Sequence, residues 1–371
     1  MLLSAWGALR FFLTPPAVYQ NVQEHYPNVV LPQHDLAGYL LGIWNIYDTP
    51  DYIKIAQEGF ASNPTWLTAL FPGYPLLIKL TGVLLFDQLL LAALVVANVA
   101  AFLFFWYLYR LVVLDYPPEV ARRAVIFSAI FPTSFFLFLG YTEAPLLAFT
   151  VAALYYARRQ CWWAAGLLAV GATLVKQPGV FLMLPLAYLF WQAWRTAPGG
   201  QGRPSWWSAL WLLPAPLAAA AYSLYRYFYL QTPSQGLTDV GASGVLTIPG
   251  LPLLRALAVI RPDNPLIVVN VIDVVFALLL IGLVTGVVVR IRRVPYTLYS
   301  LLLAGVSLAL TWPDVWRPEV NMPRRLLIIF PIYIYLACVT ANPRVFRWVG
   351  ATFLTGFLIL SGLFITWTFI S

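Results

Sequence analysis

The sequence predicts an all-α polytopic membrane protein, and its composition and the length of its apolar runs carry this prediction. Of 371 residues, 61% are hydrophobic and only 10% are charged, whereas a soluble domain has about 25% charged residues. The apolar residues recur in runs that approach the roughly 20 residues a helix needs to cross a bilayer. The runs are long and do not alternate with polar residues, so they indicate helices and exclude a membrane β-barrel.

About 11 such runs follow one another, separated by short polar or proline-rich joints. The first is too short to cross alone, and we expect it to continue toward Pro15 or to be preceded by further chain. No small-residue cleavage site follows it, which argues against a cleaved signal peptide. The expected spans are residues 1–13, 88–113, 121–140, 143–157, 161–176, 178–194, 206–230, 265–289, 295–312, 325–341 and 347–370.

Basic residues fall in alternate joints, which predicts the orientation by the positive-inside rule. We expect the cytoplasmic joints to contain Arg110, Arg122, Arg123, Arg158, Arg159, Arg195, Arg203, Arg290, Arg292, Arg293, Arg344 and Arg347. Three longer segments then face outside: 14–87, 231–264 and 313–324. They hold nearly all the remaining acids: Glu24, Asp35, Asp48, Asp51, Glu58, Asp87, Asp239, Asp263, Asp314 and Glu319.

Residues 67–86 are apolar enough to be one more span. A span there would invert every later joint and place the arginines outside. We therefore expect an interfacial or re-entrant helix on the outer face, with Lys79 reaching the headgroups. Residues 249–260 predict a similar element. The chain thus forms one transmembrane domain with a long first extracytoplasmic loop that carries interfacial helices.

The net charge of +8 does not indicate a nucleic-acid-binding protein, because the arginines are scattered and form no basic face. The 15 tryptophans and 21 tyrosines fit aromatic belts at two membrane interfaces. Cys161 and Cys338 lie at or within apolar runs, and nothing indicates a disulfide between them. Two histidines and two cysteines give no zinc spacing.

The acids indicate a chemical site at the outer face rather than a path through the bilayer. A transporter usually carries ionisable residues inside its spans, but Asp273 is the main acid within one here. Acids instead gather in the long, aromatic first outer segment, above all in WNIYDTPDYIKIAQEGF, Trp44 to Phe60.

That stretch resembles the W-x-x-W-D-x-x-x-Y-x-x-I-A-x-x-G-Y signature of the GPI mannosyltransferase II (PIG-V-like) family, which belongs to the GT-C superfamily of membrane glycosyltransferases. Three further stretches resemble family motifs in the same order, and a weaker match follows near the C-terminus. They are ALFPGYPLLIKL (Ala69–Leu80), FPTSFFLFLGYTEAPLLAF (Phe131–Phe149), ATLVKQPGVFLMLPL (Ala172–Leu186) and, more weakly, MPRRLLIIFPIYIYLA (Met322–Ala337). The family's tryptophan before the aspartate is Tyr47 here. Its arginine in the T-R motif is Lys176, which keeps the charge but loses the bidentate fork.

The resemblance implies a GT-C-like bundle and a sugar donor carried on a polyprenyl (dolichyl-type) phosphate. The sugar, which the family identifies as mannose, would pass with inversion to an extracytoplasmic lipid, glycan or protein acceptor. Asp48 matches the family aspartate thought to be catalytic, and we expect it to be the general base. The structural alternative is that Asp48 caps a helix beginning near Thr49–Pro50.

Other residues of these motifs are expected to bind substrate. Asp51, three residues after Asp48, would raise its pKa or simply favour the helix dipole. Asp35, beside His34, is a second candidate base. Glu143 opens a span in YTE and would bind a sugar hydroxyl, unless it only occupies the first turn of a helix capped by Thr142. The remaining expected contacts come from Tyr47 and Tyr141.

Cations near the outer face are expected to bind the lipid phosphate. Lys176, beside Gln177, breaks the positive-inside pattern, and Arg324 and Arg325 also lie outside; the alternatives are snorkelling and interface anchoring. Asp48 and Asp51 offer oxygens to a magnesium or manganese ion, but no third acid is close in sequence, and we expect that no metal is required.

Two other functions are compatible with the topology. A transporter or flippase of a lipid-linked sugar would need polar spans and twofold internal similarity, neither of which is visible. A non-catalytic membrane subunit would tolerate substitution near Asp48. The bias toward arginine over lysine favours the cell membrane of a prokaryote, with the site on its extracytoplasmic face; a eukaryotic chain would lie in the endoplasmic reticulum.

Overall fold

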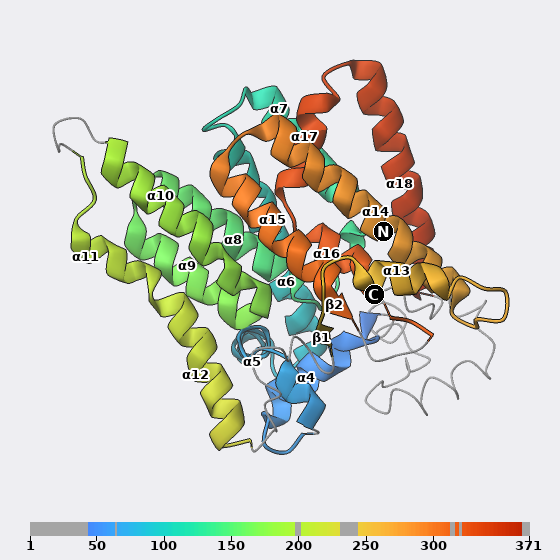
Figure 1. The fold of residues 1–371 in the computed structure, drawn as a ribbon. Helices are drawn as coiled ribbons and strands as arrows, with labels where there is room; N and C mark the ends of the chain where they lie inside the picture. The colour runs from blue at the N-terminus through green and yellow to red at the C-terminus, as the bar shows by residue number, and fades with distance from the viewer. Residues whose placement is uncertain are drawn as a thin grey trace.

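The chain is a bundle of helices with one very small sheet. The computed structural model describes residues 44–63, 65–196, 202–230, 244–311, 316–318 and 321–365. Within these residues, β1 (Val245–Leu246) pairs antiparallel with β2 (Leu310–Thr311). All other regular elements are helical, and most of the long ones stack as one bundle (Figure 1).

The helices lie where the apolar runs predict them. Those that fall on expected spans are α6 (Leu89–Val112), α7 (Pro118–Ile130), α8 (Glu143–Arg158), α9 (Trp162–Val175), α10 (Met183–Thr196), α11 (Trp206–Ala209), α12 (Pro214–Phe228), α14 (Ile267–Gly286), α15 (Val294–Ala309), α16 (Met322–Leu327), α17 (Pro331–Val339) and α18 (Pro343–Ile365). The expected span 1–13 lies outside the described residues.

Four of the described helical segments are long and apolar enough to cross a membrane. They are Leu89–Val112, Trp206–Phe228, Ile267–Ile291 and Pro343–Ile365. The second joins α11, the short helix η6 (Leu210–Leu212) and α12, and the third continues α14 through a π-helical turn, η8 (Val287–Ile291). These are the dimensions of an α-helical membrane protein.

Two expected spans are interrupted at prolines. The run 121–140 ends its α-helix at Ile130, before Pro132, and continues as the short 3₁₀ helix η3 (Ser134–Leu137). The run 325–341 is divided between α16 and α17, and Pro331 is the first residue of α17. Proline has no N–H to donate to the preceding turn, and Phe131, before Pro132, also has non-helical backbone angles. An uninterrupted helix is therefore wrong for both runs.

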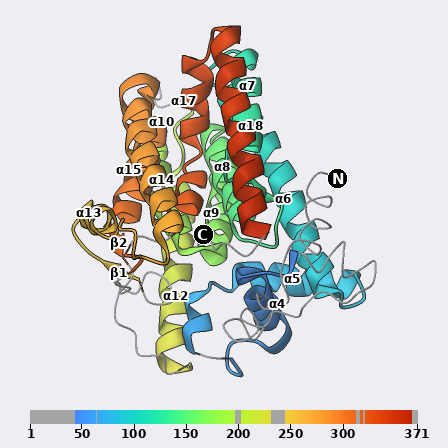
Figure 2. The same cartoon turned by 90° about the vertical axis from the view of Figure 1, so that its right-hand side faces the viewer.

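Short helices lie at one end of the bundle, where the interfacial segments are predicted. These are α4 (Asp48–Glu58), η2 (Thr65–Ala69), α5 (Gly73–Leu84) and α13 (Leu251–Ala258). The 12 residues of α5 span only about 18 Å, well short of a bilayer core. In both ribbon views α4 and α5 lie across this end of the bundle (Figures 1 and 2). We call it the α4 end.

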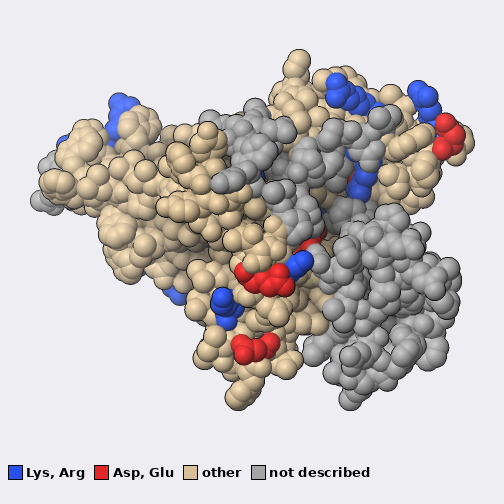
Figure 3. All heavy atoms as spheres, turned by 90° about the horizontal axis from the view of Figure 1, so that it is seen from below, with Lys and Arg blue, Asp and Glu red and all other residues tan. Residues whose placement is uncertain are grey.

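The centre of the bundle is formed where α6 and α9 pack on α8. The buried face of α6 carries a series of alanines, and small residues let helix backbones approach closely. Seen toward the α4 end, charged side chains are few among uncharged surface (Figure 3). Many large apolar side chains are exposed, including Phe102, Trp106 and Leu278, as expected of surfaces that face lipid.

Candidate functional site

Four charged side chains meet at the α4 end. Arg324 donates from Nη1 to Asp48 Oδ2 at 2.5 Å and from Nε to Glu143 Oε1 at 2.8 Å. Lys176 donates from Nζ to the same Glu143 oxygen at 2.6 Å. We call Asp48, Glu143, Lys176 and Arg324 the charged cluster. Its two carboxylates and two cations cancel in formal charge. The four residues come from four segments that are distant in sequence.

Helix ends place these four side chains. Asp48 is the first residue of α4, Glu143 is the first residue of α8, and Lys176 directly follows α9. Arg324 lies within the short helix α16. The backbone of buried Tyr47 has φ 53° and ψ −114°, an uncommon conformation for a non-glycine residue. Such strain costs about 1–3 kcal/mol and persists where the surrounding structure holds it; here it turns the chain into α4.

The structure does not use Asp48 as a helix cap. Tyr47 occupies the cap position of α4 and makes no side-chain capping hydrogen bond, while the Asp48 carboxylate contacts Arg324. The cap alternative drawn from the sequence is therefore wrong in its details. Thr142 likewise precedes α8 without a side-chain capping bond.

A glycine allows α4 to approach the start of α8. A Cβ added to Gly140 would lie 2.7 Å from Thr49 Cγ2, closer than real Cβ contacts. The Thr49 hydroxyl donates to the Gly140 carbonyl at 3.4 Å, and the Asp48 backbone N–H donates to the Tyr141 hydroxyl at 3.4 Å. The absence of a side chain at Gly140 therefore lets the start of α4, with Asp48, pack close to the start of α8, with Glu143.

Aromatic rings enclose the Arg324 guanidinium. Its Cζ lies 4.6 Å from the centre of the Tyr141 ring and 5.4 Å from that of Phe136, as in cation–π contacts. Burial alone would lower the pKa of Arg324, but the Glu143 and Asp48 carboxylates outweigh burial and hold it well above its ordinary value. Arg324 therefore stays cationic.

The four members of the charged cluster differ in exposure. The side chains of Glu143 and Arg324 are 0% and 6% exposed, whereas those of Asp48 and Lys176 are 27% and 28% exposed. Glu143 Oε2 has no hydrogen-bond partner among the described residues although it is buried. Asp48 and Lys176 thus form the accessible side of the cluster, and Glu143 lies at its buried side.

The other predicted residues lie around this cluster or away from it. Tyr141 is fully buried beneath Arg324, and Tyr47 packs on Phe364 with ring centres 5.0 Å apart. Asp51 is half-buried one turn along α4, and Gln177 is half-buried at the start of the 3₁₀ helix η4 (Gln177–Leu182).

The Arg325 side chain does not point toward the charged cluster as that of Arg324 does. Its guanidinium donates to the Ser307 carbonyl at 2.9 Å and the Leu310 carbonyl at 3.3 Å, near the end of α15. The two adjacent arginines therefore bind different partners, and the predicted paired guanidinium site is not formed by them. Asp35 and His34 lie outside the described residues.

Two features were not predicted from the sequence. Tyr52 is buried beside the cluster, where burial and then the nearby Asp48 charge raise its pKa above the ordinary value, so the phenol remains neutral. Asp273 binds Arg317 at 2.8 Å and 3.0 Å and also accepts from the Met322 backbone N–H at 3.2 Å. Asp273 therefore holds the start of α16, two residues before Arg324. An acid inside an apolar run was the available signal for it.

Among the residues that the structure describes, no group of three or more histidine, cysteine or acidic side chains could hold a metal ion. The described acids of the cluster each face a cation instead. In the structure, the carboxylates of Asp48 and Glu143 are thus held by Arg324 and Lys176.

No protein-family model matches the sequence, and no curated protein matches it. Among solved structures, the crystal structure of the Archaeoglobus fulgidus oligosaccharyltransferase complex with Zn and sulfate is similar, with a TM-score of 0.44 and 11% sequence identity. The match covers 99% of this chain and 53% of that one, so this chain spans about half the length of the archaeal protein.

Proposed function

We propose that this chain is an inverting membrane glycosyltransferase of the GT-C type, which moves a sugar from a polyprenyl phosphate to an acceptor at the α4 end. One observation carries the proposal. Asp48, Glu143, Lys176 and Arg324 were singled out by separate sequence motifs, and they meet in a single charged cluster. Ion pairing explains why opposite charges meet, and the position of the part-exposed Asp48 and Lys176 at the accessible side of the cluster favours a catalytic role as well.

In the proposed reaction, Asp48 is the general base. It takes the proton from the acceptor hydroxyl, whose oxygen forms the new bond to the anomeric carbon of the sugar. The bond from that carbon to the phosphate oxygen breaks, and the lipid phosphate leaves with the electron pair. Asp48 is part-exposed and contacts Arg324, so its carboxylate is accessible to an acceptor hydroxyl.

The two cations stabilise the leaving phosphate. A guanidinium has five N–H donors and an ammonium has three. The cluster's ion pairs use Nε and Nη1 of Arg324 and one direction of Lys176 Nζ, which leaves donors for a phosphate oxygen. Such charge-assisted contacts are most valuable as negative charge grows in the transition state.

Glu143 organises this arrangement and offers one further contact. Its Oε1 binds both cations, while Oε2 is buried and lacks a hydrogen-bond partner among the described residues. A buried acceptor of this kind is costly unless it is used. We assign Oε2 to a hydroxyl of the transferred sugar, which the family resemblance identifies as mannose. We propose a lipid, glycan or protein as the acceptor of the sugar.

The decisive experiment is Asp48→Asn in the purified full-length protein, assayed for transfer from a labelled polyprenyl-phosphate sugar. The amide keeps the shape but cannot take the proton, so the rate should fall by about 10²- to 10⁴-fold while donor binding changes little. Glu58→Gln is the matched control, because Glu58 is an exposed acid on the same helix. Equal transfer by the folded Asp48→Asn variant and the parent would contradict the proposal, and movement of the donor without transfer would favour a flippase.

A further inference from the structure

A second charged site lies at the other end of α8. Arg158 donates to both oxygens of Asp115 at 2.7 Å and 2.9 Å. Arg293 approaches the same carboxylate at 3.2 Å, and the Tyr296 hydroxyl donates to it at 3.2 Å. The Asp115 side chain is only 2% exposed. This buried acid therefore fixes the positions of two arginines from distant segments.

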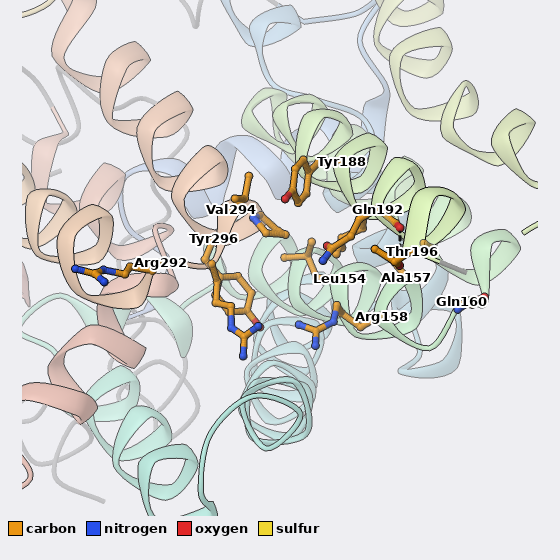
Figure 4. Close-up of a pocket in the computed structure, with 14 residues that line it drawn as sticks. Leu154, Ala157, Arg158, Gln160, Tyr188, Gln192, Thr196, Arg292, Val294 and Tyr296 are labelled. Carbon is orange, nitrogen blue, oxygen red and sulfur yellow. Dashed lines mark hydrogen bonds between the residues drawn. The ribbon is translucent and has the colours of Figure 1, made fainter. Parts of the chain in front are cut away.

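These arginines border a cavity of about 260 Å³ between α8, α10 and the start of α15. Its polar lining includes Arg158, Arg292, Arg293, Tyr188 and Gln192. Figure 4 shows Arg158 and Tyr296 on one side of the cavity and Tyr188 on the opposite side, with the Arg292 side chain directed outward at its edge. Apolar side chains, among them Leu154 and Leu189, complete the walls.

The charge of this cavity favours an anion. Among the described residues, three arginines line the cavity and no acid does; Asp115, which binds Arg158 and Arg293, is not among the lining residues. The first turn of α15 supplies Val294 and Pro295 to the lining, and a helix N-terminus also favours negative charge. The ends of α8 and α10 act in the opposite direction, but a helix terminus has only about half an elementary charge.

We propose that this cavity binds a phosphate group, either the headgroup phosphate of an anionic lipid or free inorganic phosphate. Arginines held in place by a buried carboxylate are pre-organised to donate their remaining N–H groups to phosphate oxygens. The volume of about 260 Å³ is below the roughly 300 Å³ from which pockets for drug-sized ligands begin. It therefore fits a phosphate or small headgroup rather than an entire nucleotide.

This site is separate from the charged cluster. Glu143 and Arg158 are the first and last residues of α8, and that interval of helix is about 22 Å long. The positive-inside prediction assigns the cavity to the cytoplasmic side, where anionic headgroups are enriched. Phosphate binding here does not depend on the proposed glycosyl transfer at the α4 end.

The test measures thermal protection of the detergent-purified full-length protein by short-chain phosphatidylglycerol, phosphatidylcholine or inorganic phosphate. We expect phosphatidylglycerol to protect the parent at lower concentration than phosphatidylcholine. Arg292→Gln/Arg293→Gln should raise the half-protecting concentration by at least about fivefold, because charge-assisted hydrogen bonds are lost. Protection by inorganic phosphate alone, with the same loss in the variant, would identify free phosphate as the ligand.

Two further variants keep the result decisive. Arg344→Gln/Arg347→Gln removes two exposed arginines from another basic joint and should leave protection unchanged. Ala193→Phe fills the cavity without altering charge and should abolish protection if binding occurs inside it. Equal protection of the parent, the Arg292/Arg293 variant and Ala193→Phe by phosphatidylglycerol would overturn the proposal, as would no protection of the parent by any of the three additives.

Discussion

Glu143→Gln tests the balance of charge inside the cluster. The substitution keeps the size of the side chain but removes the carboxylate that Arg324 contacts at 2.8 Å and Lys176 at 2.6 Å. The cluster would then hold two cations and one acid in a largely buried place. We therefore expect the variant to be less stable, even though nothing is lost in volume.

The size of the effect follows from burial. Removing one partner of a buried ion pair costs about 3–5 kcal/mol. Lys176 is 28% exposed and can be partly solvated, which favours the lower end, so we expect a loss of about 3 kcal/mol. For a chain longer than 250 residues, that corresponds to a fall of roughly 5 °C in the unfolding midpoint.

The assay is thermal unfolding of the full-length protein in detergent, arranged as a double-mutant cycle with Lys176→Met. The double variant restores neutrality, because Asp48 and Arg324 remain paired. It should be less destabilised than the sum of the single variants by about 1–2 kcal/mol. A midpoint within 1 °C of the parent for Glu143→Gln, or strict additivity in the cycle, would refute the charge-balance reasoning.

Three further predictions concern assembly and topology. Gly140→Ala should reduce transfer activity, because its Cβ would collide with Thr49 and displace α4, whereas Gly305→Ala, which has open space, should not; equal activities would remove the role of this close approach. Asp273→Asn removes the carboxylate that Arg317 contacts, so the free energy of unfolding should fall by about 3 kcal/mol, measured by the same thermal assay; an unchanged midpoint would contradict it. With Cys161 and Cys338 replaced by serine, an impermeant thiol reagent added outside should label Asp87→Cys and not Gln160→Cys. The opposite pattern would show that the predicted orientation in the membrane is wrong.

The boundaries of the helices were largely predictable because lipid imposes a simple rule. An apolar run must satisfy its own backbone hydrogen bonds, so α6, α8 and α9 begin and end within a few residues of the predicted limits. The breaks before Pro132 and Pro331 carried a visible signal in the proline itself. The division of the C-terminal run nevertheless decides the direction of Arg324 and Arg325, which hydropathy does not report.

The members of the charged cluster were predictable, but their mutual contacts were not. Glu143, Lys176 and Arg324 stood out as ionisable residues at the edges of apolar runs, and Asp48 as an acid in the motif of the first outer segment. The sequence predicted that Lys176 and Arg324 bind the lipid phosphate. In the structure, Lys176 contacts Glu143, and Arg324 contacts both Asp48 and Glu143. Such pairing depends on side-chain directions across segments up to 276 residues apart, which no local pattern encodes.

The order in which the cluster's members are synthesised has a consequence for biogenesis. Lys176 follows Glu143 by 33 residues, but Arg324 follows it by 181. Arg324 also follows Asp48 by 276 residues, so at the usual 5–20 residues per second of translation about 14–55 s pass between the synthesis of Asp48 and that of Arg324. Asp48 and its end of the bundle must stay hydrated throughout that interval, since the guanidinium that it contacts does not yet exist. Ribosome-bound chains that end before α16 should therefore contain inserted helices around an open, water-filled site, which closes only when the last third of the protein arrives.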